Sequence, residues 1–211
     1  MSTRCSCYES RMGADGQVPS LSTRVLAGHL VLRPGRTNDV PEVRRALRAN
    51  AEHLRPWSAT PAAGEDPTSF ASVSRTVLRH RREWKRGQSF VLYASLREDE
   101  PRIIGRVTLG GVLRGAFQNA HLGYWIDAQE QGRGLMTEAV RATTSFAFGA
   151  AGLHRVQAAV MPSNKASIRV LEKVGYRREG LAARYLFIAG AWEDHLLFAV
   201  TAEEWPDEPA R

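Results

Sequence analysis

The chain has 211 residues, which is enough for one domain with a well-filled core. Its composition, 43% hydrophobic and 24% charged, is that of a globular protein and excludes a disordered chain. Lys plus Arg outnumber Asp plus Glu by 29 to 22, a formal charge of +7. This charge suits an anionic ligand or a nucleic-acid surface, or it is a basic background without function.

The ends of the chain lack hydrophobic periodicity, so we expect a flexible leader at 1–22, a folded domain at 23–205 and a polar tail at 206–211. Cys5 and Cys7 both lie in the leader, where they can neither cross-link the domain nor complete a four-ligand zinc site, and we expect no metal. The chain has no secretory apolar segment and no run of about 18 apolar residues. The sequence therefore predicts a cytoplasmic protein without a membrane partner.

The domain opens with a predicted strand and a predicted helix. The segment HLVLRP at 29–34 is typical of a strand, and 37–50 predicts a helix with Asp39 as its N-cap. The apolar face of this helix contains Val43, Ala46 and Leu47. A loop rich in proline follows over 50–68, and such loops often carry binding groups.

A second helix is predicted to begin near Asp66, with one apolar face and with basic residues on its other faces. Apolar residues recur at helical spacing at Phe70, Val73, Val77 and Trp84. The other faces carry Arg75, Arg79, Arg82 and Lys85. These basic residues are either a solvated surface or a contact with ribosomal RNA or protein.

The rest of the domain alternates predicted strands and helices. Strands at 89–96, 102–113 and 119–127 predict an antiparallel meander. Leu135, Ala139, Ala142, Phe146 and Ala150 then predict a helix, and Val156, Ala158 and Val160 a strand. The segment 163–175 predicts a helix that Ser163 or Asn164 begins and Gly175 ends, and 185–200 predicts a hairpin with Trp192, Asp194, Leu196, Phe198 and Val200 on one face.

The stretch QEQGRGLM at 129–136 lies where a strand ends and a helix begins. Gly132 and Gly134 would let a phosphate approach the unpaired N–H groups of the helix N-terminus, and Arg133 adds a full charge. Alternatively, these residues only turn the chain into the helix. A dinucleotide fingerprint would need a third glycine where Thr137 stands, and no G-x-x-x-x-G-K-[ST] occurs.

The remaining pattern, Q-x-x-G-x-G, together with HRVQAAVMPSNKASIRVLEKVGYRREG, resembles the GNAT acyl-CoA N-acyltransferases over roughly 22–205. The stretches NAEHLRPW, LGYWIDAQEQGRGLMTEAV, HRVQAAVMPSNKAS and YLFIAGAWEDH are most similar to the ribosomal-protein-alanine N-acetyltransferases of the RimJ/RimL group, and within it to the RimJ branch. The resemblance implies an α+β fold with a mostly antiparallel sheet of six to seven strands, splayed at the acetyl-CoA site and flanked by about four helices.

The resemblance also implies a site for acetyl-CoA. The pantetheine arm would pair with the backbone near Ile126, and Asn164 would orient it. The pyrophosphate would lie on the N–H groups of the segment Gln131, Gly132, Arg133, Gly134, Leu135 and Met136.

For catalysis, the resemblance implies that Ser167 lies near the thioester and is the acid that protonates the departing thiolate. Tyr176 is the competing acid. The general base is open, because Arg184 stands near the acid of some relatives and Asp194 is only a substitute. Trp57 and Tyr124 would wall the acceptor pocket. Each of these residues also has a structural interpretation, as a helix hydroxyl, a packing ring or an ion-pair partner.

The implied reaction is direct transfer of an acetyl group to the α-amino group of a protein N-terminus, such as ribosomal protein S5. One alternative is acetylation of a small amine or antibiotic. The other is a ribosome-associated binding protein with a vestigial acetyl-CoA site, in which nucleic acid is contacted only through the ribosome. A monomer and a homodimer are both compatible with the sequence.

Overall fold

The computed structural model describes residues 18–62 and 64–206. Most of the predicted leader, with Cys5 and Cys7, and residues 207–211 of the predicted tail lie outside the described residues. Within the leader, Val18 and Leu21 pack against the main hydrophobic core, and the indole N–H of Trp84 donates to the carbonyl of Pro19 at 2.6 Å. The predicted boundary at residue 22 stays a prediction.

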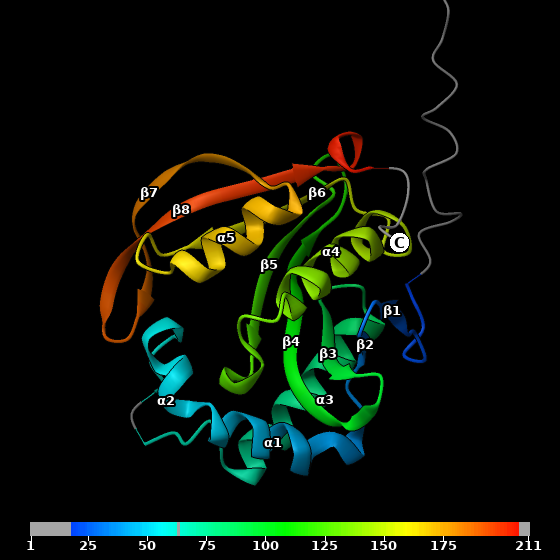
Figure 1. Ribbon diagram of the computed structural model, residues 1–211, viewed down its shortest axis with the longest axis vertical. Coiled ribbons are helices and arrows are strands. Elements are labelled where there is room, and N and C mark those ends of the chain that lie inside the picture. The colour runs from blue at the N-terminus through cyan, green and yellow to red at the C-terminus, as the bar shows by residue number, and fades with distance from the viewer. Residues whose placement is uncertain (1–17, 63, 207–211) are drawn as a thin grey trace, which may run out of the picture.

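One mixed sheet forms the centre of the molecule (Figure 1), and in the described residues its strand order is β1-β2-β3-β4-β5-β6-β8-β7. Neighbouring strands are antiparallel except for β5 and β6. The strands are β1 (Val25–Ala27), β2 (Leu30–Pro34), β3 (Phe90–Leu96), β4 (Asp99–Leu113), β5 (Asn119–Ile126), β6 (Arg155–Val160), β7 (Arg177–Ile188) and β8 (Ala191–Thr201). The predicted α+β class and the antiparallel meander from β3 to β5 are confirmed.

Helices cover both faces of the sheet. They are α1 (Val40–Ala49), α2 (Ala51–Leu54), α3 (Phe70–Lys85), α4 (Leu135–Phe148) and α5 (Lys165–Val174). In Figure 1, α4 and α5 lie in front of the sheet and α3 lies behind it. The larger core cluster packs beneath α4 and α5, and a smaller cluster of valines joins α1 and α3 to Tyr93 and Ile103 of the sheet.

The described residues contain eight strands and five α-helices, where the sequence predicted six to seven strands and about four helices. The added strand, β1, has three residues, too few to show an alternating pattern. The added helix, α2, is a single turn within the predicted proline-rich loop. Both elements depend on contacts with neighbouring elements, and neither has a hydrophobic periodicity of its own from which it could be predicted.

Local signals placed most helix ends correctly, with two corrections. Asn164 caps α5 and Gly175 ends it with a φ of +102°, as predicted. The second helix begins at Phe70 rather than near Asp66, because Ser69 accepts the N–H of Ser72 while Asp66 bonds Thr68 within the preceding turn. The carboxylate of Asp39 does not cap α1; it pairs with Arg33 and accepts the N–H of Arg36.

Two predicted faces are only partly buried. Val73, Val77 and Trp84 are buried on α3, but Phe70 is 57% exposed at the first turn of the helix. On β8, Leu196, Phe198 and Val200 are buried, whereas Trp192 and Asp194 are exposed because the hairpin extends past the helix that covers its base.

Candidate active site

The loop at 129–134 presents free backbone donors at the start of α4. Gly132 and Gly134 have φ values of +76° and +78°, a left-handed conformation that glycine adopts without steric cost. In the described part of the chain, Gln131 N–H donates to Ala128 and Glu138 N–H to Gly134, while the N–H groups between them have no backbone acceptor. Unpaired donors and a positive helix end together make an anion seat.

Neighbouring elements fix this loop in place. Asn50, which is 1% exposed, donates to the carbonyl of Ala46 and accepts the N–H of Ala128 at 2.8 Å. Leu135 and Met136 are buried and anchor the first turn of α4. The donors are therefore held in position before any ligand arrives.

Arg133 differs from the expectation in one respect. Its guanidinium pairs with Glu130, a buried carboxylate that Arg102 also contacts at 2.9 Å. About half of the Arg133 side chain remains exposed. Part of its charge is therefore neutralised within the loop, and the glycine backbone supplies the unpaired donors.

The sheet opens next to this loop. Parallel pairing of β5 and β6 ends at Leu122 and Ala158, although β5 continues to Ile126. Asp127 N–H donates to Ile104 on β4. Because successive residues of a strand direct their backbone groups to alternate sides, those of Tyr124 and Ile126 point to the open side. This opening is the splay that the resemblance implied.

Two hydroxyl groups meet across the opening. Tyr124 Oη lies 2.8 Å from Ser167 Oγ and 3.1 Å from the Ser167 carbonyl oxygen. Asn164 Oδ1 accepts the Ser167 N–H and so sets the first turn of α5. Burial raises the pKa of Tyr124, so this phenol stays protonated at neutral pH.

Tyr176 lies apart from this pair. It is 4% exposed, and its hydroxyl lies 2.8 Å from Thr144 Oγ1 on α4. Thr144 itself donates to the carbonyl of Val140, so Tyr176 is the donor in the shared bond. This phenol is thus engaged in the core, and burial raises its pKa. Its proposed role as the acid remains a prediction.

The other side of the opening is framed by the loop after α2 and by the β7–β8 hairpin, which reaches toward α2 in Figure 1. Ala189 N–H donates to Ser58, and Ala59 forms a β-bridge with Ile188. Gln131 of the glycine loop lies 3.0 Å from His53 of α2. Exposed apolar side chains border this frame: Trp57, Leu181, Tyr185, Leu186, Phe187 and Trp192.

The predicted base region contains a bulge. Between Ala182 and Leu186 the β7–β8 register shifts, and Arg184 has a φ of +50°. Asp194 Oδ1 accepts the Arg184 N–H at 2.8 Å, so this carboxylate stabilises the bulge. The side chain of Asp194 nevertheless remains exposed.

Sequence reasoning missed two features near the site. His195 is buried beside Asp194, and its Nδ1 lies 2.9 Å from the Glu193 carbonyl, which makes Nδ1 the donor and leaves Nε2 as an acceptor. The Tyr124–Ser167 contact was also missed, because it joins residues 43 positions apart. No local pattern in the sequence could have indicated the Tyr124–Ser167 contact. His195, the histidine of WEDH, could have been considered as a site residue from the sequence.

The chain belongs to the GNAT acetyltransferase family, since the model of the acetyltransferase (GNAT) domain matches residues 29–177. It is therefore an acyl-group transferase, and the predicted class of enzyme is confirmed.

The relatives point to one branch of this family. The chain is 32% identical to the [Ribosomal protein uS5]-alanine N-acetyltransferase of Escherichia coli (strain K12), over 92% of this chain and 97% of that protein. It is 48% identical to the "Probable N-acetyltransferase YjcK" of Bacillus subtilis (strain 168), but over only 48% of this chain and 56% of that protein. The structure of Mycobacterium smegmatis RimJ in complex with CoA-disulfide matches with a TM-score of 0.79 and 37% identity, covering 87% of each chain.

Two further findings concern the described residues only. They contain no group of three or more His, Cys, Asp or Glu side chains that could hold a metal ion. None of their helices combines the length and apolar character needed to cross a membrane.

Proposed function

We propose that the protein transfers the acetyl group of acetyl-CoA directly to the α-amino group of a protein N-terminus, with a ribosomal protein of the S5 kind as acceptor. One observation carries this proposal: the glycine loop, the open edge of β5 and the Tyr124–Ser167 pair surround a single opening between β5 and β6. The relationship to the uS5-alanine enzyme supports the choice of acceptor.

In this proposal the donor lies along the open edge of β5. The N–H groups from Gly132 to Met136 bind the pyrophosphate, with Arg133 as a supporting charge, whereas the expected contribution of the Gln131 N–H is reduced because it donates to Ala128. The backbone of Ile126 pairs with the pantetheine arm, and Asn164 orients it by holding the start of α5. These assignments place the thioester near Ser167.

The acceptor would enter through the frame of α2, the following loop and the hairpin. Trp57 and the exposed aromatic residues of the hairpin give this frame an apolar border, which suits a short uncharged peptide segment. A polyamine or an aminoglycoside would instead need several convergent carboxylates. The described carboxylates of α2, the following loop and the end of the hairpin are Glu52, Glu65, Asp66, Glu193 and Asp194. Glu52 already pairs with Arg55, Asp66 accepts the N–H of Thr68 and Asp194 accepts the N–H of Arg184.

The chemistry requires a neutral amine, a donor for the oxyanion and a proton for the departing thiolate. An α-amino group with a pKa of about 7.7–8.0 is partly neutral near pH 7.5, so a modest base acting through water is sufficient. Asp194 takes this role, with His195 as the competing base. The backbone N–H of Tyr124 or Ile126 receives the oxyanion, and the C–S bond then breaks.

The departing thiolate takes its proton from Ser167, and Tyr124 supports this step because its phenol contacts the same hydroxyl. Tyr176 is the less favoured acid, since its own proton is already donated to Thr144 in the core. The geometry therefore favours Ser167 for the acid.

Thiol release from acetyl-CoA tests this proposal. Peptides beginning with Ala, Ser or Met are compared with the same peptides blocked at the α-amine, with spermidine and with an aminoglycoside. We expect turnover of a free N-terminus and none of its blocked form. Equal turnover of the blocked peptide contradicts N-terminal specificity. Faster turnover of spermidine or the aminoglycoside supports the small-amine alternative. If no acceptor causes thiol release from acetyl-CoA, the vestigial-site alternative is supported.

A further inference from the structure

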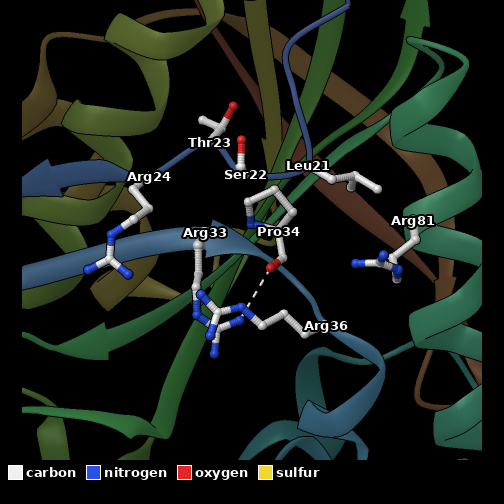
Figure 2. Close-up of a pocket in the computed structure, with 8 residues that line it drawn as sticks. All are labelled: Leu21, Ser22, Thr23, Arg24, Arg33, Pro34, Arg36 and Arg81. Carbon is white, nitrogen blue, oxygen red and sulfur yellow. Dashed lines mark hydrogen bonds between the residues drawn. The ribbon is translucent and has the colours of Figure 1, made fainter.

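A second polar site lies at the other end of the sheet from the β7–β8 hairpin. A hollow of about 430 Å³ opens between the segment before β1, the end of β2 and helix α3 (Figure 2). Its volume is in the range of small-ligand sites. The hollow is lined by Leu21, Ser22, Thr23, Arg24, Arg33, Pro34, Arg36 and Arg81.

The four arginines of this hollow are unequally neutralised. Arg33 is buried and forms a bidentate pair with Asp39, at 2.6 and 3.0 Å. Arg24 forms a bidentate pair with Glu100 at the surface. Arg81 donates to the carbonyl of Gly35 at 2.7 Å and, like Arg36, makes no ion pair in the described part of the chain. Four cations and two carboxylates leave a formal charge of +2.

The positions of these groups are fixed by the fold rather than by chance contacts of long side chains. The Arg33–Asp39 pair holds the end of β2, because Asp39 also accepts the N–H of Arg36 at 2.7 Å. The Arg81 bond to Gly35 joins the same turn to α3. Arg36 is exposed and lines the hollow, and in Figure 2 its side chain extends toward that of Arg33.

We propose that this arginine hollow binds phosphate groups of an anionic ligand, at a site separate from the acetyl-CoA opening. Guanidinium groups match phosphate oxygens in a bidentate manner, and the excess charge of two suits a phosphate chain. Among the residues that the structure describes, the lining has no aromatic ring on which a base could stack, so the ligand is recognised through its phosphates.

The same chemistry is available from a small polyphosphate or from the backbone of RNA. Helix α3 carries Arg75, Arg79, Arg82 and Lys85 beyond the hollow, and Glu83 is its only acidic residue. Of these residues, Lys85 lies one helical turn from Arg81 on the same side of α3, so a chain of phosphates leaving the hollow along the helix would reach Lys85 first. A long polyanion should therefore bind more tightly than a short one, because only the long one also contacts the basic residues of α3.

The experiment measures binding of tripolyphosphate and of a single-stranded RNA oligonucleotide by calorimetry, with one equivalent of CoA present to fill the glycine loop. Arg36→Ala is compared with Arg178→Ala, an exposed arginine on β7 at the opposite edge of the sheet that changes the net charge equally. We expect Arg36→Ala to weaken binding about tenfold or more and Arg178→Ala to leave it unchanged.

Glu100→Gln is the second variant, and it should tighten binding because Arg24 loses its competing carboxylate. Binding of tripolyphosphate assigns the hollow to a small phosphate chain. Binding of RNA alone, with a salt dependence whose slope falls by about 0.7 in Arg36→Ala, assigns it to an RNA backbone. Absence of binding to both probes, equal weakening by Arg36→Ala and Arg178→Ala, or weaker binding by Glu100→Gln overturns the proposal.

The affinity for CoA serves as the independent readout. It should be equal in the wild type and in Arg36→Ala, because Arg36 takes no part in the acetyl-CoA site. The arginine hollow and the proposed acetyl transfer can therefore fail separately.

Discussion

Replacing Gly132 or Gly134 with alanine tests the phosphate seat by adding one methyl group. Both glycines are left-handed, and a Cβ at either position meets no protein atom within 4 Å. An L-residue in this conformation costs about 1–2 kcal/mol. Since 1 kcal/mol shifts the Tm of a domain of this size by about 2–4 °C, we expect each variant to lose roughly 2–8 °C.

The effect on CoA binding should be larger than the backbone strain alone explains. The added methyl group occupies the space through which the pyrophosphate approaches, and each lost hydrogen bond to a charged oxygen costs about 1.5–3 kcal/mol. The Kd for CoA, measured by calorimetry, should therefore rise about 10- to 100-fold.

Gly64→Ala is the matched control. Gly64 has a φ of +79°, and its Cβ would also meet nothing within 4 Å, but it lies in an exposed loop outside the proposed acetyl-CoA site. Because Gly64 belongs to the loop on the acceptor side and not to the acetyl-CoA site, Gly64→Ala should show a similar or smaller loss of Tm with the wild-type Kd for CoA. A wild-type Kd in both Gly132→Ala and Gly134→Ala would refute the assignment of the loop to the pyrophosphate.

Three further predictions concern the acid, the base and the partly buried His80. Ser167→Ala should lower kcat about 100-fold with little change in KM, whereas Tyr176→Phe should keep kcat and lose only about 1 kcal/mol of stability; steady-state kinetics showing the reverse would exchange their roles. Asp194→Asn keeps an acceptor for the bulge, so its Tm should be unchanged while kcat falls, and an unchanged kcat would leave Asp194 a purely structural role. Burial and then the nearby Arg106 and Arg79 lower the pKa of His80 from 6.5 to about 3. As the pH falls, the histidine of the unfolded chain binds a proton at a higher pH than His80 of the folded chain does. The free energy of unfolding should therefore be at its full value above about pH 6.5 and fall by at most about 5 kcal/mol toward pH 3. His80→Gln should flatten that part of the stability curve in denaturant titrations, and an unaltered curve would contradict this cause.

The sequence predicted those parts of the fold that local signals determine. Asn164 and Gly175 bound α5 because a capping side chain and a left-handed glycine act within one turn. The glycine loop was found for the same reason. Short elements such as β1 and α2 were missed because they depend on neighbours that are distant in the chain.

The catalytic geometry was less predictable because it depends on long-range contacts. Tyr124 was expected only to wall the acceptor pocket, whereas its hydroxyl lies against Ser167 across the opening. Arg133 was expected to add a full charge at the phosphate, but Glu130 pairs with it. The bulge at Arg184 follows from the β7–β8 register and its bond to Asp194, which no local pattern encodes.

The proposed enzyme places the acetyl group on an N-terminal α-amine. The most direct test of this placement is fragmentation mass spectrometry of a peptide that begins with Ala and contains one internal Lys, after incubation with the protein and acetyl-CoA. We expect a single acetyl group on the first residue. An acetyl group on the lysine side chain, or an unmodified peptide under conditions in which a small amine is acetylated, would contradict this placement.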